Sequence, residues 1–574
     1  MFTSTSFIQN SGEFNYKIHW SFKGKPFKKM TGISMFTHPF QDGYSEDPKF
    51  QQAPRCLDEK KIVSVSKSIR SKPEWWVKYK NPEISAKWKS ELLAQEVRKE
   101  IIDYVLAELE FYDALRERTD GKFQIGPLDS ICYGDNVVPE ELKAEFKKAA
   151  FRLEDVPEGK KDWHPNSNNQ VLDLVHPSLY PLQYKITPIL PEGGNVGLVG
   201  QYTGKDKTSP ISEFNPDEHT IKSHFMEYGA SDRFQWLPSI FDISKDGKVT
   251  IESYINNLHP EWHGDLYGPI GKIFEAAIPG INLTLSQYAS PQRVRLDPFS
   301  NEYGLYDTPE PEWIDDDYDA YEVARQARHP APVKIKWEGI PDNQVNFDVK
   351  GRKLKVITKL ANIVLTPENP DYEGGSWHIE GQINEDIVCT AIYYYDSENI
   401  TTSELGFRVA ISDPPYEQGD DIGIREVYGI EDEDKMGLEV GGIECIEDRV
   451  LVFPNIFQHR VSPFSLADKT KPGHRKILCF FVVDPYNDRV TATDRVPPQQ
   501  SEWWVEKVSE KESNLTRRLP QELFDQVLEQ VEWPMSLKKA KEVRLELMEE
   551  RKSNLNKIDD YEHPFTREFS LCEH

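Results

Sequence analysis

With 574 residues the chain is long enough for several average domains, and its 38% hydrophobic and 11% aromatic content excludes wholesale disorder. Acidic residues (96) outnumber basic ones (69), and the net charge of -27 disfavours nucleic acid and anionic membranes as main partners, because both are bound through basic patches. The six cysteines are scattered without a C-x-x-C pair, which fits a reducing compartment and argues against a cysteine-based metal site.

The N-terminal sequence predicts neither a signal peptide nor a membrane anchor. Residues 1–20 contain no apolar core region, and the chain has no uncharged apolar run long enough to cross a bilayer. We therefore expect a cytoplasmic protein without a membrane partner. Residues 1–80 are polar and rich in turn formers, without sustained periodicity, and we expect an irregular segment there.

The next part of the chain, residues 81–330, is predicted to be mostly helical. Apolar residues recur at every fourth position from Leu93 to Leu109, which predicts a long amphipathic helix over about 84–117. Further helical patterns cover residues 138–153 and 265–277. These helices would pack on a core formed elsewhere in the chain.

Six short β-rich runs follow one another after residue 330. Turn-forming residues separate them, and such a series favours an antiparallel sandwich or barrel over a parallel α/β sheet. The runs are VKIKW (333–337), KLKVITKLANIVL (353–365), IVCTAIYYY (387–395), LGFRVAI (405–411), RVLVFP (449–454) and KILCFFVV (476–483). Between the fourth and fifth runs lies an acidic insert, 413–440, which fits a solvated loop or a lid beside an active site.

The sequence becomes helical again near its C-terminus. Pro520 suits the first turn of one helix, and Ser536 can cap the next, predicted over 536–552. We therefore predict an α+β fold in which a β core is wrapped by N- and C-terminal helices. Its segments are an irregular N-terminus (1–80), a mostly helical region (81–330), the β core (331–490) and a C-terminal helical extension (491–574).

A candidate metal site begins in the phrase GGSWHIEG, residues 374–381. On a strand, residues i and i+2 project to the same side, so His378 and Glu380 can offer two ligands to one ion. His459, near the end of a later β run, offers a third. Two histidines and one carboxylate are the facial triad of non-haem Fe(II) oxygenases, which leaves positions for a co-substrate and dioxygen. We predict that these three residues are metal ligands and thereby catalytic.

Arg475 opens the last β run, and a hairpin would return it to the metal. A guanidinium can hold a carboxylate with two parallel hydrogen bonds, which lysine cannot do. A buried arginine in an apolar core requires an anion, and a dicarboxylate co-substrate provides one. Each motif is weak alone, and it is their order along the chain that favours the metal site.

The segment 362–484 resembles the double-stranded β-helix, or jelly-roll, core of oxygenases that depend on 2-oxoglutarate and Fe(II). More closely, residues 80–555 resemble a fungal family of such proteins known only as a domain of unknown function. The phrases that carry this resemblance are QVLDLVHPSLYPL (170–182), SYINNLHP (253–260), GGSWHIEGQINEDIVCTAIYYYDSENIT (374–401), FPNIFQHRVSPF (453–464), GHRKILCFFVVDP (473–485) and WPMSLKKAKEVRLELMEERK (533–552).

The resemblance implies Fe(II), 2-oxoglutarate and dioxygen as cofactor and co-substrates, with Arg475 as the anchor of the distal carboxylate. Glu380 replaces the commoner aspartate, and Ile477 stands where the superfamily often has serine or threonine. A second polar anchor must therefore come from elsewhere in the chain. The candidates are Asn362, Ser376 and Tyr394. Hydroxylation, desaturation and oxidative cyclisation all remain open as outcomes.

Other interpretations of the same residues exist. A zinc hydrolase can also use two histidines and a glutamate, although the one His-x-x-x-His phrase, HPEWH (259–263), lacks the catalytic glutamate of that class. His164 and His176 each precede a proline and are expected to be structural. A jelly roll that binds without turnover is the alternative from another class. We favour a small-molecule substrate, although the surrounding helices could also serve a protein substrate or form a homodimer interface.

Overall fold

The computed structural model of this chain separates into two units, residues 1–33 and Ser34–His574, and everything described below belongs to the second. The structure describes residues 35–36, 51–191, 196, 206–207, 229–312, 317–416, 420–504, 520, 522–523, 526, 534–557 and 565–571. Most of the helix predicted to begin at Pro520 lies outside these residues. None of the described helices is long and apolar enough to span a bilayer.

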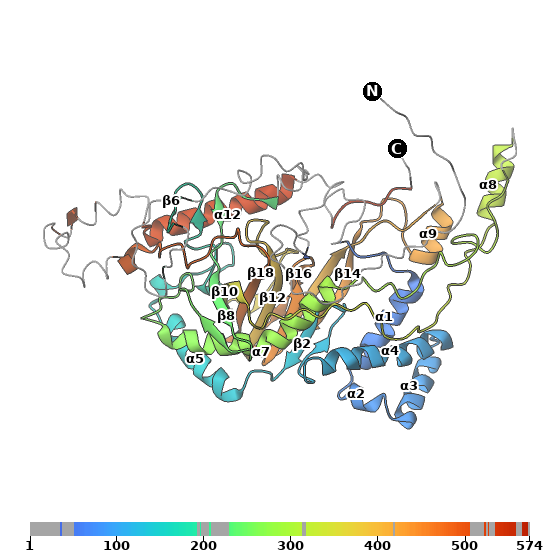
Figure 1. The fold of residues 1–574 in the computed structure, drawn as a ribbon, viewed down its shortest axis with the longest axis horizontal. Coiled ribbons are helices and arrows are strands. Elements are labelled where there is room, and N and C mark those ends of the chain that lie inside the picture. The colour runs from blue at the N-terminus through green and yellow to red at the C-terminus, as the bar shows by residue number, and fades with distance from the viewer. Residues whose placement is uncertain are drawn as a thin grey trace. The chain divides into compact units, whose positions relative to one another are not determined.

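The fold is α+β, as predicted, and its centre is a large antiparallel sheet (Figure 1). The strand order is β1-β2-β15-β12-β18-β10-β8-β9, and β3 also pairs with β10. Their bounds are β1 Gln124–Ile125, β2 Cys132–Asp135, β3 Val171–Val175, β8 Ser239–Ile243, β9 Val249–Ile251, β10 Lys353–Leu365, β12 Ile387–Glu398, β15 Arg449–Pro454 and β18 Gly473–Val483.

A smaller antiparallel sheet has the order β14-β13-β16, with β13 at Glu404–Ala410, β14 at Gly437–Glu444 and β16 at Gln458–Val461. An isolated bridge joins His378 to His459 and brings the segment before β12 beside β16. Two short strands, β11 (Asp371–Tyr372) and β17 (Phe464–Ser465), form a separate pair. Two further pairs, β4 (Leu182–Gln183) with β7 (Phe234–Gln235) and β5 (Pro188–Ile189) with β6 (Asp206–Lys207), lie outside this core.

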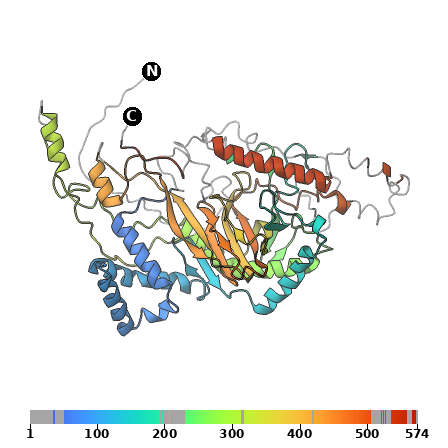
Figure 2. The same ribbon diagram turned by 180° about the vertical axis from the view of Figure 1, so that it is seen from behind.

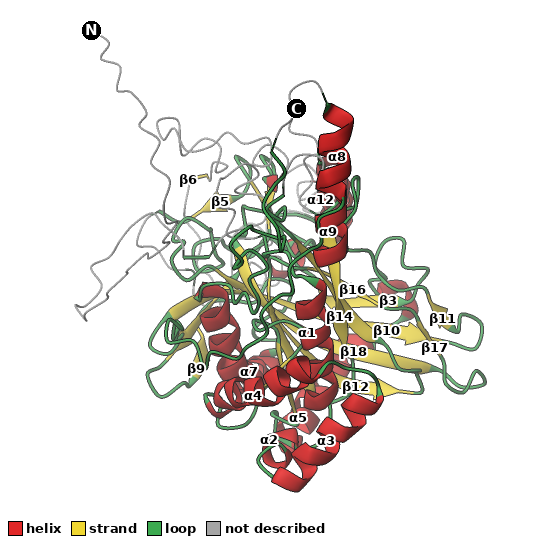
Figure 3. Cartoon of the chain, turned by 90° about the vertical axis from the view of Figure 1, so that its right-hand side faces the viewer, coloured by secondary structure: helices red, strands yellow, loops and turns green. Residues whose placement is uncertain are grey.

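Helices cover the large sheet on the side away from the small one. Helix α7 (Gly264–Ala289) packs on β15, β12 and β2, and α5 (Glu140–Glu154) packs on α7 and β12. In Figure 3, β10, β18 and β12 lie side by side near these two helices, and in Figure 2 the strands lie in front of α7. Residues 387–395 of β12 are all buried, which explains why this run is continuously apolar rather than alternating.

The remaining helices form a layer at the N-terminal side and one long C-terminal helix. Helix α4 (Lys99–Glu117) packs on α1 (Leu57–Arg70) and α3 (Pro82–Ala94), and α2 (Trp75–Lys78) joins α1 to α3. Helix α12 spans Leu537–Lys557, close to the predicted 536–552. A 3-10 turn at Glu158–Lys160, α8 (Tyr318–Gln326) and α9 (Asp421–Tyr428) complete the described helices.

Several expectations differ from the structure. The predicted helix over 84–117 is two helices, because the chain turns at residues 95–98, where Glu96 has a φ of 59°. The segment 1–80 is not irregular throughout, since α1 and α2 lie within it. Helix α1 buries Ile62, Val65 and Ile69 on one face, but its charged and serine residues dilute that pattern in the sequence.

The VKIKW run (333–337) is not a strand. Its alternating apolar residues pack against the hydrophobic core instead of pairing with another strand, and Trp337 donates a hydrogen bond to Glu110 of α4. The region 81–330 is less helical than expected, since β1, β2, β3, β8 and β9 extend the large sheet. The acidic insert 413–440 contains α9 and the start of β14, so it is not simply a loop.

Candidate metal centre

A glycine turn sets the path of the chain into the candidate site. Gly374 has a φ of 90°, and a Cβ at this position would lie 2.7 Å from the carbonyl oxygen of Val461. Only glycine combines that backbone conformation with so close an approach. The Gly375 N–H donates to the same carbonyl at 3.0 Å. The segment that follows therefore runs directly beside β16.

The two histidines are paired through their backbones. The His378 N–H donates to the His459 carbonyl at 3.2 Å, and the His459 N–H donates back at 2.9 Å. Two residues further on, Asn455 holds the backbone of Glu380: the Glu380 N–H donates to the Asn455 side chain at 2.9 Å, and the amide of Asn455 donates to the Glu380 carbonyl at 2.8 Å. The two segments that carry the ligands are thus fixed against each other.

The three predicted ligand side chains converge. Glu380 Oε1 lies 3.8 Å from His378 Nε2 and 3.5 Å from His459 Nε2, and all three ligand atoms lie within 4.8 Å of one another. Two donors that share one ion at about 2.1 Å can be no more than about 4.2 Å apart, so both carboxylate–imidazole separations fit a common ion. His378 is 40% exposed and His459 only 4%, so the cluster opens on the His378 side.

The hydrogen bonds around the cluster prepare it for a cation. His378 Nδ1 lies 2.8 Å from the carbonyl of Ser376, to which it can only donate, so its Nε2 turns a lone pair toward Glu380 in the neutral ring. Burial alone would raise the pKa of Glu380, but the two imidazoles hold it well below its ordinary value. Burial, with the neighbouring His378, lowers the pKa of His459. Burial would also lower the pKa of His378, but Glu380 raises it above its ordinary value, so metal binding there would displace a proton. A carboxylate and a neutral imidazole are the forms that bind metals.

Arg475, on β18, is buried with 2% exposure. Its guanidinium donates to the hydroxyl of Ser403 and lies 4.5 Å from the ring centroid of Phe464. No carboxylate pairs with it among the described residues, and its Nε has no hydrogen-bond partner there. Strand β18, which carries Arg475, begins at Gly473. The backbone there passes so close to the Asn399 carbonyl that a Cβ would lie 2.5 Å from it. The result is a buried cation that lacks an anion.

The three predicted second anchors lie in different places. Tyr394 faces the same side as Arg475, with 5.8 Å between the guanidinium and the ring centroid. Ser376 contributes its backbone carbonyl to His378, while the residue itself is exposed. The prediction for Asn362 is wrong: its side chain accepts a hydrogen bond from Tyr395, which packs on Phe146 of helix α5, on the opposite face of the sheet. Alternation along β10 separates it from the site.

Two site residues have no clear signal in the sequence. Ser403 lies between two strands and reaches Arg475 only after the sheets have formed. Asn455 directly follows β15 and could have been singled out as a loop residue next to a ligand strand, but its hydrogen bonds to Glu380 depend on a contact across 75 positions of the chain.

Five cysteines, Cys56, Cys132, Cys389, Cys445 and Cys479, are buried and free.

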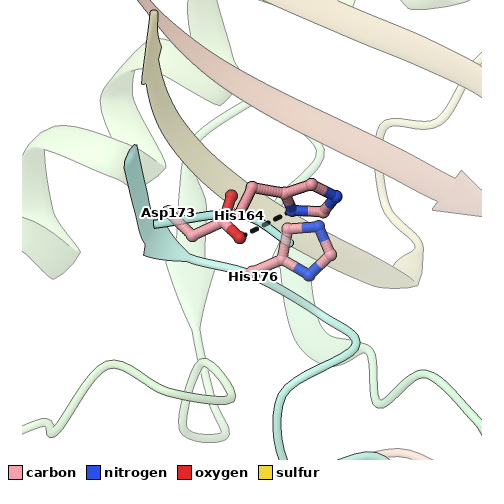
Figure 4. Close-up of side chains that lie close together, drawn as sticks. All are labelled: His164, Asp173 and His176. Atoms are coloured by element: carbon pink, nitrogen blue, oxygen red, sulfur yellow. Dashed lines mark hydrogen bonds and ion pairs between the residues drawn. The ribbon is translucent and has the colours of Figure 1, made fainter. Parts of the chain in front are cut away.

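A second cluster joins His164, Asp173 and His176 (Figure 4). His164 Nδ1 lies 2.8 Å from an Asp173 oxygen, and the two imidazole rings lie 5.0 Å apart. The two histidines were expected to be structural, and the sequence pattern did not connect them with Asp173. HPEWH (259–263) forms no such cluster among the described residues, because His259 Nδ1 accepts hydrogen bonds from the following backbone amides.

Comparisons with known proteins give a family and distant structural likenesses. The sequence matches the family described as "Protein of unknown function (DUF4246)" over residues 99–507, and "Domain of unknown function DUF4246, N-terminal" over residues 13–91. No curated protein matches the chain.

Three solved structures illustrate the likenesses. IDO from Bacillus thuringiensis is 12% identical over 23% of this chain and 47% of its own, with a TM-score of 0.14. The Fe(II)/(alpha)ketoglutarate-dependent dioxygenase TqaL is 13% identical over 46% and 71%, with a TM-score of 0.20. A bsmA homolog from Methylobium petroleophilum PM1 is 8% identical over 64% and 93%, with a TM-score of 0.24. The chain spans about half the length of the Bacillus protein, and at these TM-scores the likenesses carry no argument.

Proposed function

Because the chain belongs to the DUF4246 family, whose function is unknown, its activity has to be argued from its own site, and we propose that it is an Fe(II)- and 2-oxoglutarate-dependent oxygenase. The proposed substrate is a small molecule in which an unactivated C–H bond is oxidised. His378, Glu380 and His459 would hold the iron, and Arg475 would bind the distal carboxylate of 2-oxoglutarate. The His/Glu/His donor set is typical of such iron sites.

The observation that carries this proposal is that Arg475 has no carboxylate partner among the described residues. A buried guanidinium without a carboxylate partner is costly, and an anionic ligand offsets that cost. Phe453 of β15 is paired through Thr390 with Phe481 of β18, which alternation places on the same face as Arg475. The ring of Phe453 lies 4.8 Å from that of His459. Arg475 and the metal ligands therefore share one side of the sheet. A molecule with a carboxylate at one end and a chelating 2-oxo acid at the other fits both.

The finer fold that we propose is a double-stranded β-helix. Eight segments fall into two sheets: β10-β18-β12-β15 in the large one, and residues 377–380, β16, β13 and β14 in the small one. In chain order the chain passes from one sheet to the other at each step except between β13 and β14. A jelly roll has eight strands in two sheets of this kind. The ligands come from the second and seventh segments and the arginine from the eighth, so all of them lie between the sheets.

Iron bound at this site would supply the activation of dioxygen, with 2-oxoglutarate oxidised to succinate and CO2 as one oxygen atom enters the substrate and the other enters succinate. The chain's own residues bind and orient. Asn455 fixes the backbone of Glu380, and the Ser376 carbonyl fixes the tautomer of His378. Phe464 and Tyr394 cover the guanidinium of Arg475 and exclude water from it. The exposed side of His378 leaves an approach for the substrate.

Succinate release from 2-oxoglutarate, measured with Fe(II) and oxygen but without substrate, tests the proposal. We expect slow uncoupled turnover that is lost in His378→Ala. His474→Ala is the matched control, because His474 lies next to Arg475 in sequence but pairs with Asp396 at 3.0 Å. Turnover retained in His378→Ala would refute the ligand assignment. Tight zinc binding without 2-oxoglutarate binding would instead favour a zinc hydrolase, and ligand binding without turnover a non-catalytic jelly roll.

A further inference from the structure

The second cluster has residue types that can bind a metal, but the protonation state of His176 makes it a hydrogen-bond donor instead. The Ser178 N–H donates to His176 Nδ1 at 3.2 Å, and burial lowers the pKa of His176 to about 3. The neutral ring therefore carries its proton on Nε2, the nitrogen that points toward His164 in Figure 4. That atom is a donor rather than a ligand. Arg544 lies 3.6 Å from the Asp173 carboxylate and further opposes a divalent cation there.

The cluster and the candidate metal centre lie on the same face of the large sheet. Cross-strand partners in a sheet project to one side, and residues alternate along each strand. Along β10, Ala361 is paired with Asp173 of β3, and Ile363 is paired with Arg475 of β18. Both positions share the face of Lys359, which is paired with Cys479. Lys359 therefore points into the space that the metal ligands also face.

The charge of Lys359 acts on both clusters. Burial alone would lower the pKa of Lys359, but the carboxylates of Glu380 and Asp173 raise it above its ordinary value. Its charge in turn lowers the pKa of His176, in addition to the larger effect of burial. The ammonium group is thus within electrostatic range of both the metal centre and the second cluster. Yet Lys359 makes no hydrogen bond or ion pair with any residue that the structure describes.

The two carboxylates near Lys359, those of Glu380 and Asp173, interact with other cations. Glu380 would be a metal ligand, so its charge would be shared with the ion. Asp173 contacts His164 and Arg544. Beyond Lys359, the positive charges beside the second cluster are Arg544 and Lys541, and both pair with Asp162. Among the described residues, three positive charges (Lys359, Arg544 and Lys541) therefore face the two negative charges of Asp162 and Asp173, and one positive charge is left over once Glu380 is bound to the metal.

We propose that Lys359 binds a carboxylate of the substrate beside the metal centre, with the His176 N–H as a second donor, so that the substrate is a small organic acid. This inference rests on the proposed function, since it assigns the substrate class of the same site. One ammonium and one neutral N–H match the single charge and two oxygens of a carboxylate. The half-buried position of Lys359 strengthens such a pair relative to one in water.

The experiment uses the full chain with Mn(II) and saturating 2-oxoglutarate, and as probes two acids with their neutral amides: phenylacetate with phenylacetamide, and isovalerate with isovaleramide. Saturation-transfer NMR gives the affinities, and Mn(II)-induced relaxation reports proximity to the metal. We expect each acid to bind about ten- to hundredfold more tightly than its amide, the range that a hydrogen bond to a charged group provides. We also expect the acids to be relaxed by the metal.

Variants assign the effect to one side chain. Lys359→Met should abolish the preference for acids, and Lys359→Arg should retain most of it. Lys353→Met is the matched control on the same strand, because Lys353 is exposed and pairs with Glu252. Arg475→Met must keep the preference, which excludes binding of the acids in the place of the co-substrate. Thermal melting checks that each variant is folded.

Several outcomes would overturn the inference: equal affinity for acids and amides, an acid preference that survives in Lys359→Met, or a preference lost in Arg475→Met. A loss of 2-oxoglutarate affinity in Lys359→Met as large as in Arg475→Met would make Lys359 a co-substrate anchor instead. If neither Mn(II) nor 2-oxoglutarate binds, the proposed function fails. The saturation-transfer comparison needs no metal, so in that case it still decides whether Lys359 binds a carboxylate.

Discussion

Arg475→Met should separate ligand binding from folding. In the proposed complex the guanidinium makes two hydrogen bonds to a carboxylate, each worth about 1.5–3 kcal/mol. Their loss, about 3 kcal/mol at the least, corresponds to a hundredfold or greater weakening of 2-oxoglutarate binding at 1.4 kcal/mol per tenfold change. Metal affinity should be unchanged, because no metal ligand is altered. Isothermal titration of 2-oxoglutarate into Mn(II)-loaded protein measures the 2-oxoglutarate affinity, and titration of Mn(II) into the metal-free protein measures the metal affinity.

The same substitution should not destabilise the ligand-free protein. Arg475 is 2% exposed and lacks a carboxylate partner among the described residues, so its burial costs free energy. Methionine removes that cost, which is several kcal/mol for a buried ion. It gives up a hydrogen bond to Ser403, worth about 1.5–3 kcal/mol, and the contact with Phe464, worth about 1 kcal/mol. We expect the melting temperature of the ligand-free variant to equal or exceed that of the wild type.

Arg449→Met is the matched control, because Arg449 is also largely buried but has its anion in place. It donates to the two carboxylate oxygens of Asp135 at 2.6 and 2.8 Å and to the Glu444 carbonyl at 2.9 Å. Its loss should lower the free energy of unfolding by about 1–3 kcal/mol and leave 2-oxoglutarate affinity unchanged. Arg475→Met behaving like this control, destabilised but with normal 2-oxoglutarate binding, would refute the role of Arg475 as an anchor.

Three further predictions follow from the described contacts. Asn455→Ala should weaken metal binding about 10–100-fold, as loss of a residue that orients a ligand does, and an unchanged metal titration would contradict this. Burial and the nearby Asp484 raise the pKa of Asp386 to about 7, above its value of about 3.9 in the unfolded chain, so stability should fall as pH rises from about 4 to 7. Asp386→Asn should flatten that fall in thermal melts across pH. Elemental analysis should find one metal per chain, lost in His378→Ala and kept in His176→Ala; a second metal lost in His176→Ala would refute the protonation argued for that cluster.

Features that depend on neighbouring residues could be predicted from the sequence. The spacing of His378 and Glu380 places both side chains on one side of an extended chain, whatever the rest of the fold. The continuous apolar runs of β12 and β18 are typical of strands buried on both faces, and their bounds lie close to those predicted. The positive φ at Gly374 fits a glycine turn before the first ligand.

Features that depend on distant pairing could not be predicted in this way. VKIKW has the alternation of a strand, but whether it pairs depends on which neighbour is available, and the core provides a packing surface instead. His164 meets Asp173 because Trp163 bridges to Leu172 and the His164 N–H donates to the Val171 carbonyl. The residues of that cluster carry no spacing signal, since an antiparallel turn rather than a regular element brings them together.

The C-terminal helix α12 ties together the segments on either side of the proposed site. Arg551 donates to Glu385 at 2.7 Å, and the same buried carboxylate accepts from the backbone of Trp236 at 2.7 Å, close behind the ligand segment. Arg544, two turns earlier, pairs with Asp162 beside the second cluster. One rigid helix therefore fixes the spacing between the loop that follows Glu380 and the second cluster. Residues beyond the matched family region, which ends at 507, thus contribute directly to the geometry of the site.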